Sequence, residues 1–150
     1  MAIKVGDRIP AATLKRLTPE GIKDVNTVEF FKGRKVALFA VPGAFTPTCS
    51  AKHLPGFVEK ADQIRAKGVS EIVCISVNDA FVMDSWGKDR KVGDKVTLLA
   101  DGNAEFSRAL GLDFDGSGFG MGIRAQRFSA LVEDGVVKSL HVEAPGKFEV

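Results

Sequence analysis

Residues 36–49 of the chain read VALFAVPGAFTPTC. The first six form a short apolar run with charged residues before it and Pro42-Gly43 after it, a pattern that favours a strand buried on both faces over a helix. A seven-residue loop follows, and a helical pattern begins at about Cys49. Because a buried strand that leads through a loop into a helix opens a β-α-β unit, this stretch indicates an α/β fold.

The predicted helix covers residues 49–67. Its apolar residues recur every three or four positions and form one stripe (Leu54, Phe57, Val58, Ala61 and Ile64). Arg65 and Lys67 suit the negative end of the helix dipole, and Gly68 supplies the stop. Pro55 falls inside this helix, so we expect it to remove one backbone hydrogen bond and to bend the first turn.

The remaining pattern alternates in the same way. Strands are predicted at 71–77 and 96–100, a helix capped by Asn78-Asp79 at 80–90, and a short helix ending near 110–111. A helical turn is expected at 27–31, with hairpins at 12–25 and 127–142, the second closed by Asp134-Gly135. We therefore predict one domain over residues 1–150, an α/β sandwich with a mixed central sheet flanked by helices and an extra N-terminal β-hairpin. This is compatible with the thioredoxin fold, while pattern alone leaves other α/β folds open.

The composition narrows the functional classes. The chain has 150 residues, of which 45% are hydrophobic, and two cysteines are too few for a disulfide scaffold. The formal net charge is +2 and basic residues are interspersed with acidic ones, so we expect no nucleic-acid partner. The N-terminus lacks the apolar core of a secretory signal, and no apolar run reaches the length of a membrane span. We expect a cytoplasmic protein with no membrane partner, whose cysteines are thiols.

Cys49 is the candidate nucleophile. A cysteine in the first turn of a helix lies near unsatisfied N–H donors and the positive end of the dipole, and both favour the nucleophilic thiolate. Thr46, three residues earlier, can bring a hydroxyl to the same corner, and Pro42 and Pro47 restrict the loop. The alternative is that Cys49 is a small buried hydrophobe, and the residues alone leave both interpretations open.

The spacing Pro42-xxx-Thr46-xx-Cys49 resembles the active-site signature of the peroxiredoxins. The string PGAFTPTCSAKHLPGF is similar to their type II, or peroxiredoxin-5-like, subfamily. The segments VCISVNDAFVMDSW, LLADGNAEFSRALG and RAQRFSALVEDGVVKSLHVE extend the resemblance over nearly the whole chain. It implies a thioredoxin-like fold and a thiol peroxidase that reduces hydrogen peroxide and organic hydroperoxides without a cofactor. Cys49 is then the peroxidatic cysteine that becomes a sulfenic acid, Thr46 hydrogen-bonds the peroxide, and Pro42 shapes the pocket.

The resemblance also implies a role for an arginine. Arg127, which precedes Phe128-Ser129, matches the family's arginine that stabilises the thiolate and the developing charge on oxygen. Arg124 is the rival for this role, and spacing alone does not separate the two.

Three further residues are weaker candidates for the substrate pocket. His53 lies one helical turn after Cys49 and can face the thiol, although a hydrophilic helix surface or a local hydrogen bond is the plainer interpretation. Phe45 and Phe119 can line an apolar mouth for organic peroxides, or lie in the core or in a dimer interface. Cys49 and His53, with the distant His141, raise the question of a metal site. No third soft ligand lies close to Cys49 and His53 in sequence, so we expect no metal. Residues 116–122 do not fit a nucleotide-binding loop, and we expect a flexible loop near the site.

The second cysteine, Cys74, falls in the predicted strand 71–77, so we interpret it as a core residue without a redox role. The C-terminal sequence LHVEAPGKFEV holds no resolving cysteine. By analogy with relatives that lack one, we expect an external thiol to recycle Cys49, with glutathione and glutaredoxin ahead of thioredoxin, in a homodimer. The alternatives are a thiol–disulfide oxidoreductase and a non-enzymatic peroxide sensor.

Overall fold

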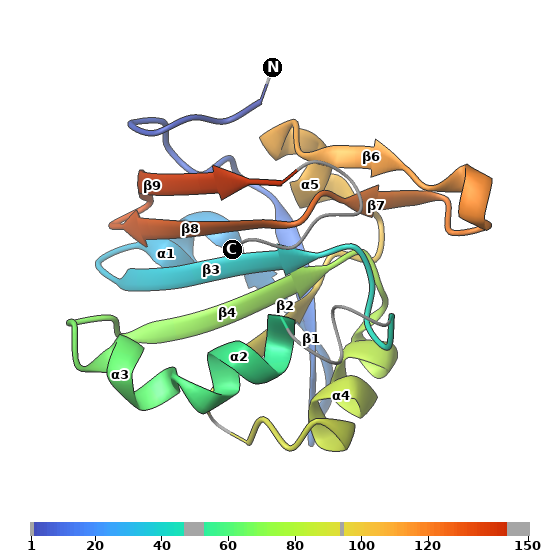
Figure 1. The fold of residues 1–150 in the computed structure, drawn as a ribbon, viewed down its shortest axis with the longest axis horizontal. Coiled ribbons are helices and arrows are strands. Elements are labelled where there is room, and N and C mark those ends of the chain that lie inside the picture. Colours follow the sequence, from blue (N-terminus) through green and yellow to red (C-terminus); the bar gives the residue numbers. More distant parts are fainter. Residues whose placement is uncertain (1, 47–52, 94, 144–150) are drawn as a thin grey trace.

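A seven-stranded mixed sheet forms the centre of the molecule (Figure 1). The computed structural model describes residues 2–46, 53–93 and 95–143. The strands of this sheet lie in the order β2-β1-β5-β4-β3-β8-β9. Their bounds are β1 Thr13–Thr18, β2 Gly21–Asn26, β3 Lys35–Val41, β4 Glu71–Ser76, β5 Thr97–Ala100, β8 Phe128–Glu133 and β9 Val136–Val142. The helices are α1 Thr27–Phe31, α2 Leu54–Glu59, α3 Ala61–Arg65, α4 Ala80–Asp89 and α5 Glu105–Leu110. The mixed sheet, its helices and the β1–β2 hairpin confirm the predicted architecture.

The central strands are buried on both faces, as the apolar runs predict. In β3, Leu38 and Ala40 belong to a core that also holds Phe31 of α1 and Phe106 of α5. The alternate β3 residues, Phe39 and Val41, point to the other face and pack in a second core. That second core is built with side chains of α2, α3 and α4, among them Leu54, Ala61, Met83 and Trp86. The helices therefore cover both faces of one sheet, because side chains alternate along a strand.

One end of the sheet gathers three connections. β3 and β4 are parallel, with Val41 paired to Ser76, so the loops that leave both strands emerge side by side. β8 is antiparallel to β3, with Phe128 paired to Ala40, and it therefore begins at this same end. In open α/β sheets, functional sites form beyond the carboxyl ends of the parallel strands. The fold thus brings the segment after Val41 next to the segment before Phe128.

The helix predicted over residues 49–67 differs in its described part. The backbone of Lys60 has φ −98° and ψ 9°, which ends α2 and separates it from α3. Pro55 lies in the first turn of α2, and the residues against which the expected bend and the lost hydrogen bond would be judged fall outside the described residues. Residues 47–52 of the predicted helix lie outside the described residues.

The segment predicted as a flexible loop lies within a hairpin. β6 (Asp113–Asp115) pairs antiparallel with β7 (Ile123–Ala125) in a separate two-stranded sheet, and a 3₁₀ turn, η2 (Ser117–Phe119), lies between them. By contrast, Asp134-Gly135 closes the β8–β9 hairpin as predicted. Both residues have positive φ, 49° and 78°, as the favoured two-residue hairpin turn requires.

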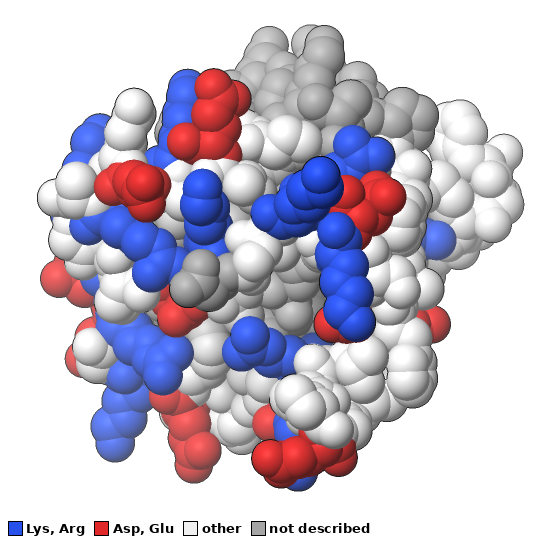
Figure 2. All heavy atoms as spheres, turned by 90° about the horizontal axis from the view of Figure 1, so that it is seen from below, with Lys and Arg blue, Asp and Glu red and all other residues white. Residues whose placement is uncertain are grey.

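The surface agrees with the charge pattern of the sequence. On the face seen in Figure 2, Lys and Arg side chains are interspersed with Asp and Glu. Among the helices in the described part of the chain, none has the length and apolar character that a membrane crossing requires.

Candidate active site

The predicted site residues fall on the end of the sheet where the three connections meet. Pro42 and Thr46 belong to the loop after β3, His53 precedes α2, and Arg127 precedes β8. Pro47 and Cys49 lie outside the described residues. The surroundings of the candidate nucleophile are therefore described by the residues on either side of its segment and by Arg127.

The loop after β3 closes into a tight turn. The hydroxyl of Thr46 donates to the carbonyl oxygen of Gly43 at 2.6 Å, and the Thr46 amide donates to the same oxygen at 3.3 Å. A threonine hydroxyl has one hydrogen to donate and two lone pairs that accept. Because Gly43 takes the hydrogen, Thr46 Oγ1 meets a further polar group as an acceptor.

Phe45, inside this turn, has a left-handed backbone with φ 65°. This conformation is a steric outlier for a bulky residue and costs about 1–2 kcal/mol relative to a right-handed one. Its neighbour Ala44 donates its amide hydrogen to Asn78 Oδ1 at 2.9 Å, and Asn78 Oδ1 also accepts from the Ser76 hydroxyl at 2.6 Å. The β4–α4 connection thus holds the strained turn by its backbone.

Asn78 is a site residue that sequence reasoning missed. Asn78-Asp79 was expected to cap α4, and Asp79 does so by accepting from the Val82 amide at 2.8 Å. The side chain of Asn78 points instead to the loop after β3. Asparagine is common beside helix starts, so the residue type alone does not reveal this contact.

Arg127 and His53 form a buried pair. Arg127 Nη1 lies 2.7 Å from His53 Nδ1, and the exposed fractions of the two residues are 8% and 1%. The imidazole also packs against an aromatic pair, with ring centroids 4.9 Å from Phe39 and 5.6 Å from Phe57. The expectation of a hydrophilic helix surface for His53 is wrong, because the ring is enclosed by aromatic side chains.

This environment determines the protonation of His53. Burial, and secondly the positive charge of Arg127, lower the pKa of His53 from 6.5 to about 3. The imidazole is therefore neutral at pH 7. An arginine can only donate, so Nδ1 accepts the hydrogen bond and the ring proton resides on Nε2. Arg127 is thereby contacted by a neutral partner that adds no charge of its own.

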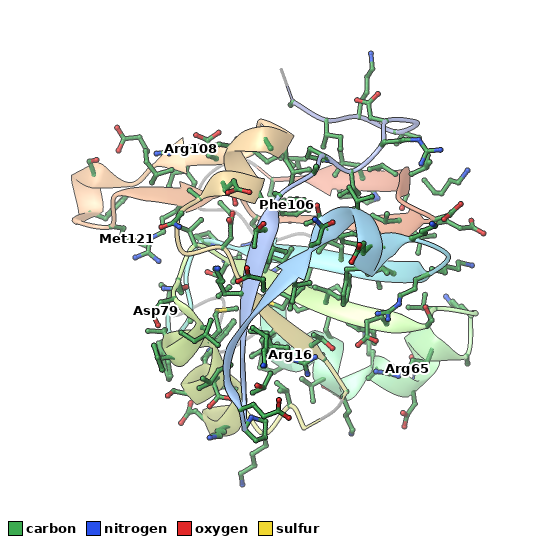
Figure 3. The ribbon with its side chains drawn as sticks, turned by 180° about the vertical axis from the view of Figure 1, so that it is seen from behind. Arg16, Arg65, Asp79, Phe106, Arg108 and Met121 are labelled. Carbon is green, nitrogen blue, oxygen red and sulfur yellow. The ribbon has the colours of Figure 1, made fainter. Side chains whose placement is uncertain are left out.

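Arg124 has different partners. Its Nε donates to the carbonyl oxygen of Met121 at 2.9 Å, and its Nη1 donates to those of Val77 at 3.1 Å and Pro42 at 3.4 Å. All three acceptors are backbone carbonyls of loops at this end of the sheet. Figure 3, seen from behind, shows Met121 and Asp79 at the same edge of the molecule. Sequence spacing did not separate the two arginines. In the described residues Arg127 Nη1 contacts the His53 side chain, whereas Arg124 donates to backbone carbonyls of three loops.

Glu143 is a second residue near Arg127 that no sequence pattern pointed to. Its amide donates to the carbonyl oxygen of Arg127 at 2.9 Å, so the two residues lie side by side across the strands. The residue is 6% exposed, and its carboxylate oxygens are buried and accept no hydrogen bond from the described residues. The backbone of Arg127 is thus tied to the segment that follows β9.

The exposed fractions of the remaining candidate residues show which of them lie in the core. Phe45 and Phe119 are 49% and 85% exposed, so the alternative that they lie in the core is wrong. Phe81 at the start of α4 is exposed as well, at 58%. Cys74 is fully buried in β4, in agreement with its interpretation as a core residue.

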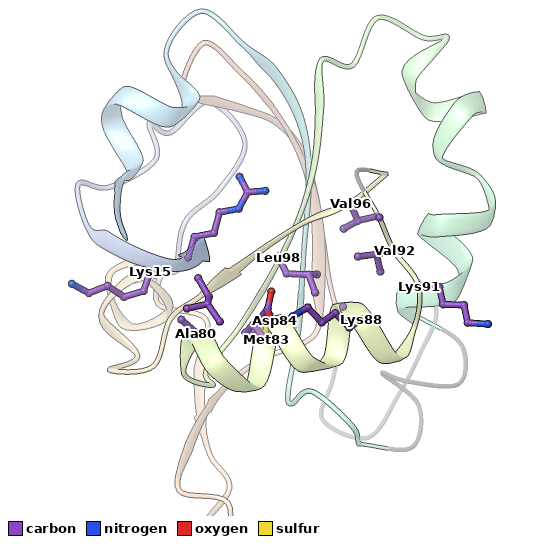
Figure 4. A pocket seen from close by; sticks show the side chains of 13 residues that line it. Lys15, Ala80, Met83, Asp84, Lys88, Lys91, Val92, Val96 and Leu98 are labelled. Atoms are coloured by element: carbon purple, nitrogen blue, oxygen red, sulfur yellow. Dashed lines mark ion pairs between the residues drawn. The ribbon is translucent and has the colours of Figure 1, made fainter. Parts of the chain in front are cut away.

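Neither a group of metal ligands nor the surface hollow beside α4 adds to this site in the part of the chain that the structure describes. Within the described residues, no group of three His, Cys, Asp or Glu side chains is arranged to hold a metal ion. A surface hollow of about 450 Å³ lies between β1 and α4, where Lys88 and Asp84 form an ion pair of 3.0 Å (Figure 4). Its lining residues include none of the predicted site residues.

Known proteins match nearly the whole chain. It matches the Redoxin family over residues 4–149. It is 51% identical over 151 residues to Peroxiredoxin-2E, chloroplastic, of Arabidopsis thaliana, covering 98% of this chain and 64% of that protein. It is 45% identical over 149 residues to Peroxiredoxin-2B of the same plant, covering 99% and 92%. The crystal structure of reduced Prx3 of Vibrio vulnificus in complex with H₂O₂ is 53% identical. It superposes with a TM-score of 0.95, covering 99% of this chain and 92% of that one.

Proposed function

Because the chain belongs to the Redoxin family and is a type II peroxiredoxin, we propose that it is a thiol-dependent peroxidase acting through Cys49. The predicted thioredoxin-like fold is confirmed by the structural match to Prx3 of Vibrio vulnificus. The observation that carries the proposal is the buried Arg127, fixed by neutral His53 at the end of the sheet from which the segment bearing Cys49 leaves. A nearby arginine lowers the pKa of a thiol, and the thiolate attacks peroxides.

The reaction has two stages. In the first, the Cys49 thiolate attacks the terminal oxygen of a hydroperoxide ROOH, the O–O bond breaks, and Cys49 becomes a sulfenic acid. The alkoxide or hydroxide that leaves takes up one proton and departs as alcohol or water. In the second, a reductant thiol RSH attacks the sulfenic acid and releases water. A second thiol then cleaves the resulting mixed disulfide, which restores Cys49 and yields the oxidised reductant.

Thr46 and Arg127 take complementary parts in the first stage. Thr46 Oγ1 accepts the hydroxyl hydrogen of the peroxide, since its own hydrogen is held by Gly43. Arg127 donates hydrogen bonds to the sulfur and to the peroxide oxygens, where negative charge develops as the O–O bond breaks. Pro42 follows β3 directly and limits the conformations of the loop that carries Thr46.

We further propose that the reductant is external. Cys74 is fully buried in the middle of β4, and a disulfide requires two Cα atoms within about 7 Å of each other. A thiol in that position cannot reach an exposed partner without local unfolding. Glutathione with glutaredoxin is the favoured reductant and thioredoxin the second.

The experiment measures the consumption of hydrogen peroxide and of tert-butyl hydroperoxide by the purified protein. Each peroxide is tested with glutathione plus glutaredoxin and with thioredoxin. We expect repeated turnover in the wild type, none in Cys49→Ser, and most of the wild-type rate in Cys74→Ser. Consumption of only one equivalent of peroxide with reductant present would instead identify a sensor. A mass spectrum after one equivalent, with and without glutathione, should show a sulfenic acid or a glutathione adduct on Cys49. An internal Cys49–Cys74 disulfide would overturn the external route.

A homodimer and a cytoplasmic location complete the proposal. The exposed Phe45, Phe81 and Phe119 supply apolar surface of the kind that subunit interfaces bury. Sedimentation at several concentrations tests the dimer, and it fails if the mass stays that of one 16.1 kDa chain. The single domain over 1–150 is supported by one Redoxin match across residues 4–149.

A further inference from the structure

We propose that Arg124 is a positioning residue that joins three loops by their backbone carbonyls and so holds Thr46 in its reactive geometry. This inference rests on the proposed peroxidase function. It separates the two arginines by mechanism: Arg127 acts on charge at the reacting atoms, and Arg124 acts on the shape of the turn that presents Thr46.

The hydrogen bonds of Arg124 reach the backbone of three different loops. Pro42 follows β3, Val77 follows β4, and Met121 lies in the hairpin segment between β6 and β7. Two of these contacts are long-range, since Pro42 and Val77 are 82 and 47 residues away along the chain. A planar guanidinium offers five donors in a fixed fork, so one side chain can bind three carbonyls at once.

The packing around Gly43 ties Arg124 to Thr46. A Cβ atom placed on Gly43 would lie 3.1 Å from Arg124 Nη1 and 3.0 Å from Thr46 Cγ2. Only the absence of a side chain at Gly43 lets the guanidinium and the threonine approach the same backbone this closely. A shift of the guanidinium therefore opens space directly beside the turn.

The turn also needs external support. Phe45 has an unfavourable left-handed backbone, and such strain persists only where the surroundings over-determine it. Asn78 holds Ala44 on one side of the turn, and Arg124 holds Pro42 on the other. Without Arg124 the backbone of Phe45 is expected to relax and to carry Thr46 away from its position.

Arg124→Met tests the proposal, because methionine keeps the length of the side chain and removes all its donors. Arg108→Met is the matched control, since Arg108 is exposed on α5 (Figure 3). We expect Arg124→Met to lower the second-order rate with hydrogen peroxide roughly 10- to 100-fold, the usual effect of misplacing a reacting group by about 1 Å. The pH midpoint of Cys49 alkylation should move less than in Arg127→Met. A larger movement than in Arg127→Met would overturn the proposal.

Arg124→Lys separates positioning from charge. Lysine keeps the positive charge but presents a point charge without the planar fork, so we expect most of the rate loss to remain. A return to the wild-type rate would show that charge alone matters and would overturn the positioning role. This milder variant also serves if Arg124→Met does not fold.

Hydrogen exchange provides a readout that does not depend on activity. In both Arg124 variants the peptide covering residues 42–46 should exchange faster, while peptides within β3 and β4 keep their wild-type protection. Unchanged protection at 42–46 would overturn the inference even if activity fell. Conversely, if the wild type fails to consume peroxide, the proposed function fails, and the exchange measurement still decides whether Arg124 holds the turn.

Discussion

Arg127 Nη1 and His53 Nδ1 lie 2.7 Å apart, although 74 residues separate them along the chain. Both residues are buried, and the imidazole is neutral at pH 7 because its pKa is about 3. The neutral imidazole orients the guanidinium through a hydrogen bond without adding a second charge.

Replacement of Arg127 should affect His53 and, on the proposed function, the Cys49 thiol. In Arg127→Met we expect the pKa of the Cys49 thiol to rise and the rate of peroxide attack at pH 7 to fall. The pKa of His53 should rise above about 3 but stay below 6.5, because burial, its larger cause, remains. Iodoacetamide alkylation against pH reports the thiol, and NMR titration reports the imidazole. A His53 pKa unchanged by the substitution would contradict the arrangement, and Arg108→Met should alter neither value.

His53 should make the protein less stable in mild acid. The unfolded chain binds a proton at this ring near pH 6.5, whereas the folded chain does not until about pH 3. Between these values the unfolded state binds more protons, so stability falls as the pH falls. Going from pH 7.5 to pH 5 costs about 2 kcal/mol from this group, at about 1.4 kcal/mol per pH unit below 6.5.

We expect this acid-dependent loss to shrink by about that amount in His53→Gln. Urea unfolding followed by the fluorescence of buried Trp86 at the two pH values provides the measurement. The control is His141→Gln at the other, exposed histidine, which should retain the wild-type pH dependence. Burial raises the pKa of Asp101, so this carboxyl stabilises the folded chain towards acid, but its contribution is common to all three proteins. Equal losses in wild type and His53→Gln would refute the assignment.

The left-handed backbone at Phe45 can be detected by comparing glycine with alanine. Both substitutions remove the half-exposed ring, but only glycine adopts φ 65° without a steric penalty. We expect Phe45→Gly to be more stable than Phe45→Ala by about 1 kcal/mol in urea unfolding. The same pair at Phe81, which lies in α4, should show the opposite order, because glycine is the poorer helix former. A preference for alanine at both positions would exclude the strained turn.

Gly43→Ala should disturb the site more than the fold. The added Cβ meets Thr46 Cγ2 at 3.0 Å and Arg124 Nη1 at 3.1 Å, so both must move by a few tenths of an ångström. We expect peroxide consumption to fall about tenfold or more, with secondary structure retained. Gly56→Ala in α2 is the control, since no atom lies within 4 Å of its added Cβ and alanine favours the helix. If Gly43→Ala reacts with peroxide at the wild-type rate, the close packing around the turn has no role in reactivity.

Much of the fold could be predicted because its signals are local. The alternation of Leu38 and Phe39 between two cores follows from an apolar run too short for a helix. The turn at Asp134-Gly135 follows from residue types that tolerate positive φ. The helix break at Lys60 carries no comparable signal, because lysine is a good helix former and only the local backbone geometry reveals the interruption.

The site was predictable only in part, since its contacts are long-range. Motifs named Cys49 and Arg127 as candidates, but they did not reveal the contact between Arg127 and His53. The apolar stripe beginning at Leu54 did not reveal that His53 is enclosed by Phe39 and Phe57. Arg124 and Asn78 bind backbone groups, and a backbone carbonyl or amide has no residue-type signature by which a sequence pattern could find it.

The antiparallel pairing of β3 with β8 also determines at which stage of folding the candidate site is assembled. Lys35 pairs with Glu133 and Ala40 with Phe128, so the arginine reaches its place only after nearly a hundred residues of intervening chain have been closed into a loop. Such non-local pairings are slow to form. A chain still emerging from the ribosome therefore exposes its cysteine segment before Arg127 has been synthesised. The thiol should remain sluggish throughout synthesis and acquire its reactivity only when the last strands join the sheet.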